Sequence, residues 1–347
     1  MKYILNSSRE SRVLEGCSWR LSFFFVFFLL SIGPLSVSQG VAQDYPTRAL
    51  RIIVPFPPGG GNDILARRLA QVLTPALAKP VIVDNKPGAS SIIGTEFVAK
   101  APPDGYTILM GNNGALTINP SMFPELQYDP VKDFAPITLL GSAPLAWLVH
   151  PSVPARSVQE LIALAKTRPG QLNFGSAGIG IVTHLAPEML KSMARIELTA
   201  IPYKSAGGVI SDLISGQIDM LFTSMIVALP AVRSGRVRII AFTSAERSSV
   251  LPDVPTIAES GFPGYEATVW YAILAPARTH QEVIKRLNVE FVKALNNPKV
   301  RESLVVDGAQ VIGSSPEALS AVIRSDLAKW ARVIKEAGLA RNKGGDS

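Results

Sequence analysis

The stretch that most constrains the fold is IIVPFPPGGGNDILARRLAQVL, residues 52–73. A β-branched apolar run ends among three prolines and three consecutive glycines, and the residues that follow place their apolar members at helical spacing. The pattern predicts a strand, a glycine loop and a helix. Such a loop directs backbone N–H groups and the positive end of a helix dipole at one point, which is typical of an anion-binding site.

The same alternation of strands and helices continues along the chain. Further strand and helix patterns follow up to about residue 112, and a second run of the same kind covers residues 157–244. Strands that alternate with helices favour an α/β fold with mostly parallel sheets covered on both faces.

Two apolar segments, residues 137–152 and 265–277, are unusually long for single strands. A strand of that length can leave one domain and enter another. We therefore expect a two-lobed fold joined by two crossover strands, with a cleft that hinges shut. Lobe 1 comprises residues 43–147 and 270–347, and lobe 2 comprises residues 148–269.

The first 42 residues have the features of an export signal. Basic residues precede the apolar run LSFFFVFFLL at residues 21–30, and small residues close the segment at Ala42. This predicts a signal peptide cleaved near Ala42, with a mature protein that begins near Gln43. The apolar run is far shorter than the roughly 20 residues that a membrane-spanning helix needs.

Cysteine and histidine usage narrows the chemistry. The one cysteine, Cys17, lies in the predicted signal peptide, which excludes disulfides and cysteine nucleophiles from the mature chain. His150, His184 and His280 are scattered without ligand spacing, so we expect no metal site and no cofactor. The basic residues behind the net charge of +7 are dispersed, so we expect no nucleic-acid partner.

A second glycine loop occurs in LNFGSAGIGIVTHLAPEML, residues 172–190. Gly178, Gly180 and Thr183 come within one residue of a dinucleotide-binding fingerprint. The ribose-binding acid is missing, however, because Glu197 precedes the next strand instead of ending it. A nucleotide-dependent enzyme that uses Gly178–Gly180 remains the alternative function.

No catalytic constellation emerges. The first loop lacks the Lys-Ser/Thr ending of a phosphate-binding P-loop, and a nucleophile elbow would need glycine where Phe174 stands. His184 has no acid placed to orient it. We therefore predict no catalytic residues.

Three further positions are open to interpretation. Asp63 is expected to be the N-cap of the first helix, although a ligand ammonium group would also recruit it. The loop GNNGALTINP, residues 111–120, follows a strand at the edge where α/β sheets bind ligands. Trp270 belongs either to the core or to the wall of the cleft.

The chain resembles a known family. The segments YPTRALRIIVPFPPGGGNDILAR, NKPGASSIIGTEFVAKAPPDGYTILMGNNG, IPYKSAGG and LPDVPTIAESGFPGYEATVWYAILAPA are similar to the periplasmic solute-binding receptors of tripartite tricarboxylate transporters, the Bug or TctC type. The resemblance implies a periplasmic-binding-protein fold, a periplasmic location and a monomer. It also implies capture of a small carboxylate for a membrane transporter or a sensor, with no enzymatic activity.

The resemblance further implies that backbone amides and bridging waters hold the carboxylate, and not an arginine. Ile179 and Ile181 stand where relatives usually carry small polar residues, which favours a monocarboxylate with an apolar body over citrate. The implied ligand-binding residues are Phe56, Pro57, Gly59, Gly60, Gly61, Asn62, Asp63, Asn112, Asn113, Ser176, Gly178, Gly180, Thr183, His184, Tyr203 and Thr223.

Overall fold

The computed structural model describes residues 45–123, 125–176, 178, 180–203, 206–306 and 308–339. The predicted signal peptide and its cleavage site after Ala42 lie outside the described residues. No helix in the described part of the chain is both long and apolar enough to cross a membrane.

The first sheet has six strands among the described residues, in the order β11-β4-β10-β3-β1-β2. β1, β2 and β3 are parallel, whereas β10 runs antiparallel to both β3 and β4. The strands are β1 (Leu50–Val54), β2 (Val81–Asn85), β3 (Thr107–Asn112), β4 (Phe134–Pro144), β10 (Thr268–Pro276) and β11 (Gln310–Val311).

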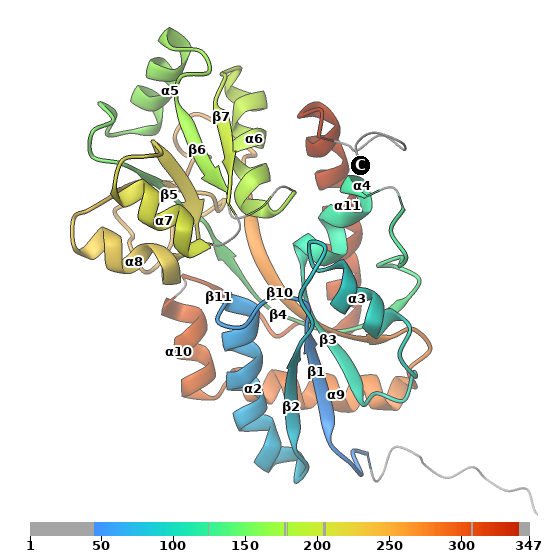
Figure 1. The fold of residues 1–347 in the computed structure, drawn as a ribbon. Coiled ribbons are helices and arrows are strands. Elements are labelled where there is room, and N and C mark those ends of the chain that lie inside the picture. The colour runs from blue at the N-terminus through green and yellow to red at the C-terminus, as the bar shows by residue number, and fades with distance from the viewer. Residues whose placement is uncertain are drawn as a thin grey trace, which may run out of the picture. The chain divides into compact units, whose positions relative to one another are not determined.

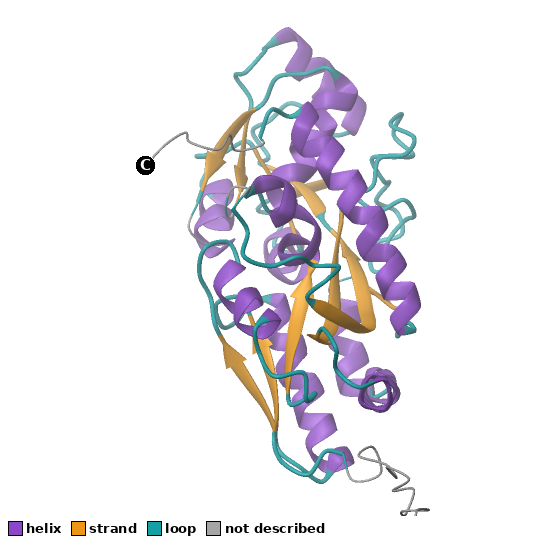
Figure 2. Ribbon diagram, turned by 90° about the vertical axis from the view of Figure 1, so that its right-hand side faces the viewer, coloured by secondary structure: helices purple, strands orange, loops and turns teal. Residues whose placement is uncertain are grey.

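Helices cover both faces of this sheet (Figures 1 and 2). One face packs against α2 (Gly61–Leu77), α9 (Gln281–Leu295) and α10 (Pro298–Val306). The other packs against α3 (Ile92–Ala99), the π-helical turn η1 (Gly114–Ile118) and the start of α11 (Pro316–Glu336).

Strand β10 shows why the sheet is covered twice. Tyr271 and Ile273 belong to the core on the α2 face, and Trp270 and Leu274 belong to the core on the α3 face. Successive side chains of a strand point to opposite faces, so a continuously apolar strand needs a hydrophobic layer on each side.

The second sheet has the strand order β7-β6-β8-β5-β9. The helices α5 and α6 contribute to the core on one face, and α7 and α8 contribute to the core on the other. The elements are β5 (Ala146–Val149), α5 (Val158–Thr167), β6 (Asn173–Ser176), α6 (Val182–Ala194), β7 (Thr199–Pro202), α7 (Ala206–Ile214), β8 (Met220–Thr223), α8 (Met225–Arg233) and β9 (Arg238–Phe242).

Both predicted crossovers are present. The first long segment divides at Leu145 into β4, which belongs to the first sheet, and β5, which belongs to the second. The second enters the first sheet as β10, while Ala267, immediately before it, bonds to Thr243 after β9. The α/β fold with two sheets joined by two crossover strands is confirmed.

The sheets are mixed, which corrects the expectation that they are mostly parallel. Among the described strands, four pairings are parallel and five are antiparallel. The antiparallel pairings all involve β4, β5 or β10. Parallel neighbouring strands need a helical crossover connection, and the strands that pass from one sheet to the other lack one.

Helix α11 contributes to the hydrophobic cores of both sheets. Leu319 and Ile323 pack in the core of the first sheet, and Trp330 and Val333 pack in the core of the second. The lobe boundaries at residues 147, 148, 269 and 270 remain predictions.

Two helices, α8 and α10, were not predicted from the sequence pattern. Helix α8 contains Pro230, which interrupts a helical pattern, and α10 is a single short stretch between two longer helices.

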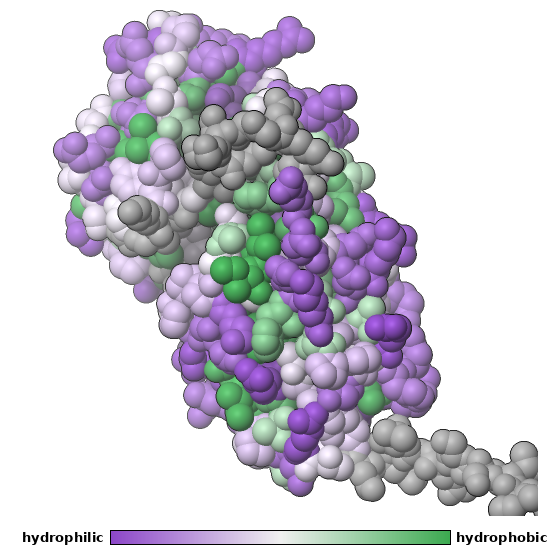
Figure 3. Space-filling model, turned by 45° about the vertical axis from the view of Figure 1, so that its right-hand side comes forward, coloured by the Kyte–Doolittle hydropathy of each residue, from purple (hydrophilic) through white to green (hydrophobic). Residues whose placement is uncertain are grey.

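Apolar side chains fill the interior, while on the face drawn in Figure 3 hydrophilic residues surround smaller hydrophobic areas.

Candidate functional site

The first glycine loop joins β1 to α2. Gly59 has a φ of +86°, in the left-handed region, and Gly60 is the N-cap of α2, with a φ of −82°. Asp63, expected at the N-cap, lies in the first turn instead, so that expectation is wrong. The helix begins earlier because the glycines adopt the turn at no steric cost.

Asp63 nevertheless bonds back to the loop. Its Oδ2 accepts hydrogen bonds from the backbone N–H of Gly59 at 2.9 Å and from Nε of Arg67 at 3.0 Å. Its Oδ1 accepts from Nδ2 of Asn85 at 2.9 Å. Burial raises the pKa of Asp63, but the hydrogen bonds from Arg67, Gly59 and Asn85 outweigh burial and leave the pKa below its usual value.

Arg67 and Asn85 were missed in the sequence. The spacing of Asp63 and Arg67, four residues apart on a helix, is a recognisable ion-pair signal. Asn85 carries no such signal, because its place beside the loop depends on the pairing of β1 with β2, in which Val54 is opposite Asn85.

The first turn of α2 offers backbone donors. Among the described residues, the N–H groups of Gly61 and Asn62 have no acceptor, as is usual for the first turn of a helix. Phe56 is half-buried and Pro57 is exposed beside them. These donors and the helix dipole favour an anion at the turn, and the charge of Asp63 in the same turn is paired with Arg67.

Three asparagines connect this turn to the end of β3. Oδ1 of Asn62 accepts from Nδ2 of Asn112 at 3.3 Å, and Oδ1 of Asn112 accepts from the N–H of Ala115 at 3.1 Å. Nδ2 of Asn113 donates to the carbonyl oxygen of Thr268 at 2.7 Å. The asparagines therefore join α2, β3 and the start of crossover strand β10.

Tyr271 on β10 is a third residue that the sequence did not assign to the site. A Cβ atom on Gly61 would lie 2.7 Å from its hydroxyl oxygen. The first residue of α2 therefore lies against this hydroxyl, and the absence of a side chain at Gly61 permits the approach.

The second glycine loop joins β6 to α6. Gly178 and Gly180 have φ values of +149° and +75°. Ser176 donates its hydroxyl proton to the carbonyl of Gly178, and α6 begins at Val182, one residue from the start expected at Thr183. The N–H groups of Val182 and Thr183 have no acceptor within the described part of the chain. Ile179 lies outside the described residues.

His184, in the first turn of α6, forms a hydrogen bond with the backbone of this loop. Its Nδ1 accepts a hydrogen bond of 3.2 Å from the N–H of Gly180, and its ring lies 6.1 Å from that of Phe174. Burial, assisted by the positive charge of Lys191, lowers the pKa of His184 to about 4. The imidazole is therefore neutral at pH 7, and an Nδ1 acceptor requires the proton to be on Nε2.

Two buried oxygens of predicted site residues lack partners. Oδ1 of Asn113 and Oγ1 of Thr183 have no hydrogen bond among the described residues. Buried polar atoms are nearly always paired with protein, water or ligand, so these two oxygens have the capacity to accept a hydrogen bond from a water or a ligand.

The remaining predicted residues lie at the ends of two strands of the second sheet, Tyr203 just after β7 and Thr223 as the last residue of β8. Tyr203 donates its hydroxyl proton to Oδ2 of Asp212 at 2.7 Å, and burial together with Asp212 raises its pKa to about 12. Thr223 is buried at the end of β8.

The segment from Asn112 to Met122 contacts both glycine loops. Asn112 bonds to Asn62 beside the first loop. Met122, at the end of α4 (Asn119–Met122), lies against Gly180 in the second loop, where a Cβ would be 2.9 Å from its Cε. The structure thus links the predicted residues of the two sheets through one connecting segment.

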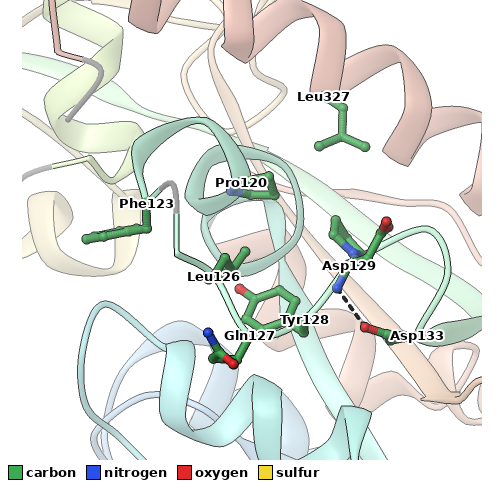
Figure 4. Close-up of a pocket in the computed structure, with 9 residues that line it drawn as sticks. Pro120, Phe123, Leu126, Gln127, Tyr128, Asp129, Asp133 and Leu327 are labelled. Carbon is green, nitrogen blue, oxygen red and sulfur yellow. Dashed lines mark hydrogen bonds between the residues drawn. The ribbon is translucent and has the colours of Figure 1, made fainter. Parts of the chain in front are cut away.

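A cavity of 590 Å³ lies elsewhere, between the loop after α4 and helix α11 (Figure 4). None of the predicted ligand residues lines it. Its lining residues are Pro120, Phe123, Leu126, Gln127, Tyr128, Asp129, Pro130, Asp133 and Leu327.

Trp270 packs in the core and not in a cleft wall. It is 3% exposed, and its Nε1 donates to Oδ2 of Asp326 on α11 at 2.6 Å. The described residues contain no group of three or more metal-ligating side chains.

Comparison with known proteins identifies the family. Residues 65–339 match the family described as "Tripartite tricarboxylate transporter family receptor", TctC. The chain belongs to the TctC family. TctC proteins are periplasmic solute-binding receptors, so the resemblance is confirmed.

Relatives of this TctC protein include BugT of Bordetella pertussis, which is 36% identical, with 89% of this chain and 97% of BugT covered. The solved structure of R. palustris Rpa4515 with adipate has a TM-score of 0.78 and 35% identity, covering 85% of this chain and 99% of that one. MatC (Rpa3494) from Rhodopseudomonas palustris with bound malate has a TM-score of 0.75 and 30% identity, covering 84% and 100%.

Proposed function

We propose that this TctC protein, as a monomer, captures a small carboxylate between its two glycine loops. It presents that ligand to the membrane subunits of a tripartite tricarboxylate-type transporter or to a sensor. The observation that carries the proposal is the pair of helix starts, because both Gly61–Asn62 and Val182–Thr183 offer N–H groups without protein acceptors among the described residues. Two such helix starts suit an anion without an arginine.

The bound ligands of two relatives support a carboxylate. Rpa4515 was solved with adipate and MatC with malate. The unpaired oxygens of Asn113 and Thr183 are suited to bridging waters or to a hydroxyl on the ligand. In this proposal the remaining contacts come from Phe56, Pro57, Gly59, Gly60, Asn112, Ser176, Gly178, Gly180, His184, Tyr203 and Thr223, while Asp63 acts by bonding to the first loop at Gly59.

A substitution series at Gly60 tests the location. A Cβ there would meet no atom closer than 4.0 Å, and the φ of −82° suits any residue. Replacement by alanine, valine and leucine should change the unfolding free energy by only about 1 kcal/mol, the scale of an N-cap effect. The affinity for the carboxylate, measured by calorimetry, should fall as the side chain grows. Equal affinity across the series would place the ligand elsewhere.

The class of carboxylate is a separate proposal. Ile181 supplies no side-chain donor, is half-buried, and its Cδ1 would lie 3.7 Å from a Cβ on Gly178. A second ligand carboxylate without partners would cost several kcal/mol, whereas an apolar body gains roughly 25 cal/mol per Å² buried. We therefore favour a monocarboxylate with an apolar body over citrate.

The relatives favour a different candidate, a dicarboxylate such as adipate or malate. Calorimetry with benzoate, branched aliphatic acids, adipate, malate and citrate separates the two. Tighter binding of adipate or malate than of every monocarboxylate would overturn the monocarboxylate proposal and leave carboxylate capture intact.

Export follows from the predicted signal peptide. Protein recovered from a periplasmic extract should begin near Gln43, as read by N-terminal sequencing. An intact Met1 on cytoplasmic protein would contradict it.

A further inference from the structure

Three polar side chains beside the first glycine loop form a closed hydrogen-bond cluster. Nδ2 of Asn85 donates to Oδ1 of Asp63 at 2.9 Å, and Arg67 Nη2 lies 2.9 Å from the same Oδ1. Nε of Arg67 donates to Oδ2 of Asp63 at 3.0 Å, and Nη2 donates to Oδ1 of Asn85 at 2.8 Å. Each of the three residues therefore bonds to the other two.

The same cluster forms hydrogen bonds with the loop at Phe56 and at Gly59. Asp63 accepts from the N–H of Gly59 at 2.9 Å, and Nδ2 of Asn85 donates to the carbonyl oxygen of Phe56 at 3.1 Å. A Cβ on Gly59 would have no atom within 4 Å, so little packing surrounds the loop there. Phe56 also packs against the core of the first sheet, whereas Gly59 is restrained mainly by its hydrogen bond to Asp63.

The cluster rests on two rigid elements. Asp63 and Arg67 belong to α2, and Asn85 ends β2, whose next residue, Lys86, donates its N–H to the carbonyl of Val54 at 2.8 Å. Hydrogen bonds therefore hold the loop to both the helix that follows it and the strand beside it, so its conformation depends on the packing of the sheet.

Charge within the cluster also matters for an anion. The side chain of Asp63 is 4% exposed and lies in the first turn of α2, where its negative charge would oppose a bound carboxylate. The two-pronged contact with Arg67 neutralises that charge and occupies the guanidinium. The first turn therefore keeps its backbone donors without a competing net charge.

We propose that Asp63, Arg67 and Asn85 are positioning residues. They hold the first glycine loop in the shape that presents the amides at the start of α2, and Arg67 cancels a charge that would repel the ligand. The inference rests on the proposed function for its effect on affinity, whereas the effect on loop shape stands independently of any ligand.

The first test uses amide hydrogen exchange of the ligand-free protein. Asn85→Leu removes the bonds to Phe56 and Asp63, and exchange of the Gly59 amide, which donates to Asp63, should become at least about tenfold faster, while β1 and β3 keep their rates. Arg51→Met is the matched control, because Arg51 pairs with Asp84 on the neighbouring position of β2 and has no hydrogen bond to the loop among the described residues. Unchanged exchange in Asn85→Leu would overturn the inference.

The second test measures adipate affinity by calorimetry. Arg67→Met should weaken binding by about tenfold or more, since one uncompensated charge remains near the anion. The double variant Asp63→Asn/Arg67→Met removes that charge and keeps an acceptor for Gly59, so it should recover part of the affinity. Arg51→Met should bind as the wild type does.

A purely structural role predicts a different result. In that case the variants would lower the melting temperature and leave the dissociation constant unchanged, and the double variant would show no recovery of affinity. A wild-type protein that binds no adipate counts against the proposed function for that ligand, and the exchange rates then decide the inference by themselves.

Discussion

The hydroxyl of Thr243 donates a hydrogen bond of 2.7 Å to the carbonyl oxygen of Ala267. The same hydroxyl accepts from the N–H of Leu145 at 2.8 Å. The backbone of Thr243 adds two more bonds, one to Leu145 at 3.0 Å and one from Ala267 at 2.9 Å. Thr243, which follows β9, thus ties the two crossover segments together where they pass between the sheets.

Thr243→Val is expected to destabilise the protein at this junction. Valine keeps the shape but leaves the buried N–H of Leu145 without its acceptor, which costs about 1–3 kcal/mol of unfolding free energy. Urea unfolding measures the loss. Thr199→Val is the control, because the Thr199 hydroxyl bonds to Gly170 at an exposed site, and its removal should cost less. Equal losses would contradict a special role for the junction.

Ligand-induced closure is also expected to respond to this change. In the predicted hinge motion the two crossover strands bend, so loosening their link should alter the balance between open and closed states. Small-angle scattering of the wild-type protein should show a smaller radius of gyration with saturating ligand. A smaller ligand-induced change in Thr243→Val than in the wild type is the predicted outcome.

His184 gives the protein a pH-dependent stability. Its pKa is about 4 in the folded state and 6.5 when unperturbed, because burial and Lys191 disfavour the charged ring. The unfolded chain therefore binds the proton first as the pH falls. Stability from neutral His184 is complete above pH 6.5 and decreases by about 1.4 kcal/mol per pH unit toward pH 4, about 3 kcal/mol in total.

His184→Asn should remove that component of the slope. The Oδ1 of asparagine can accept from the N–H of Gly180 in place of Nδ1, and it does not titrate. Unfolding free energies measured from pH 4 to pH 7.5 in both proteins give the difference. Parallel pH profiles would show that His184 is not the responsible group.

Gly59 and Gly60 should respond differently to alanine. Gly59 has a φ of +86°, so Gly59→Ala costs about 1–2 kcal/mol in backbone strain although the space is open. Gly60 has a φ of −82°, and Gly60→Ala loses only the smaller N-cap preference. Urea unfolding compares the two, and a cost at Gly60 equal to that at Gly59 would contradict this assignment of the turn.

Trp270→Phe separates stability from binding. The indole N–H donates to Asp326 at 2.6 Å, and its loss should cost about 1.5–3 kcal/mol, as for bonds to charged groups. Trp270 packs against α11, so ligand affinity should be unchanged in a variant that melts at a lower temperature. A large loss of affinity with an unchanged melting temperature would show instead that Trp270 contacts the ligand.

The sequence alone determined the local units of this protein. Strand runs, glycine loops and amphipathic helices are set by residues that are neighbours in the chain, so β1, the loop at Gly59–Gly61 and α2 could be predicted from one stretch. The two crossover strands could be predicted as well, because their apolar length exceeds what one sheet uses. The family resemblance followed from the same segments.

Only the tertiary structure decided which polar groups meet. Asn85 reaches Asp63 because β2 pairs with β1 in one register. Trp270 bonds to α11 because β10 enters the sheet with the side chain of Trp270 on the face that α3 and α11 cover. Asp63 bonds back to Gly59 because the helix begins before it. Local hydrophobic periodicity does not encode strand order or register, and side-chain hydrogen bonds depend on both.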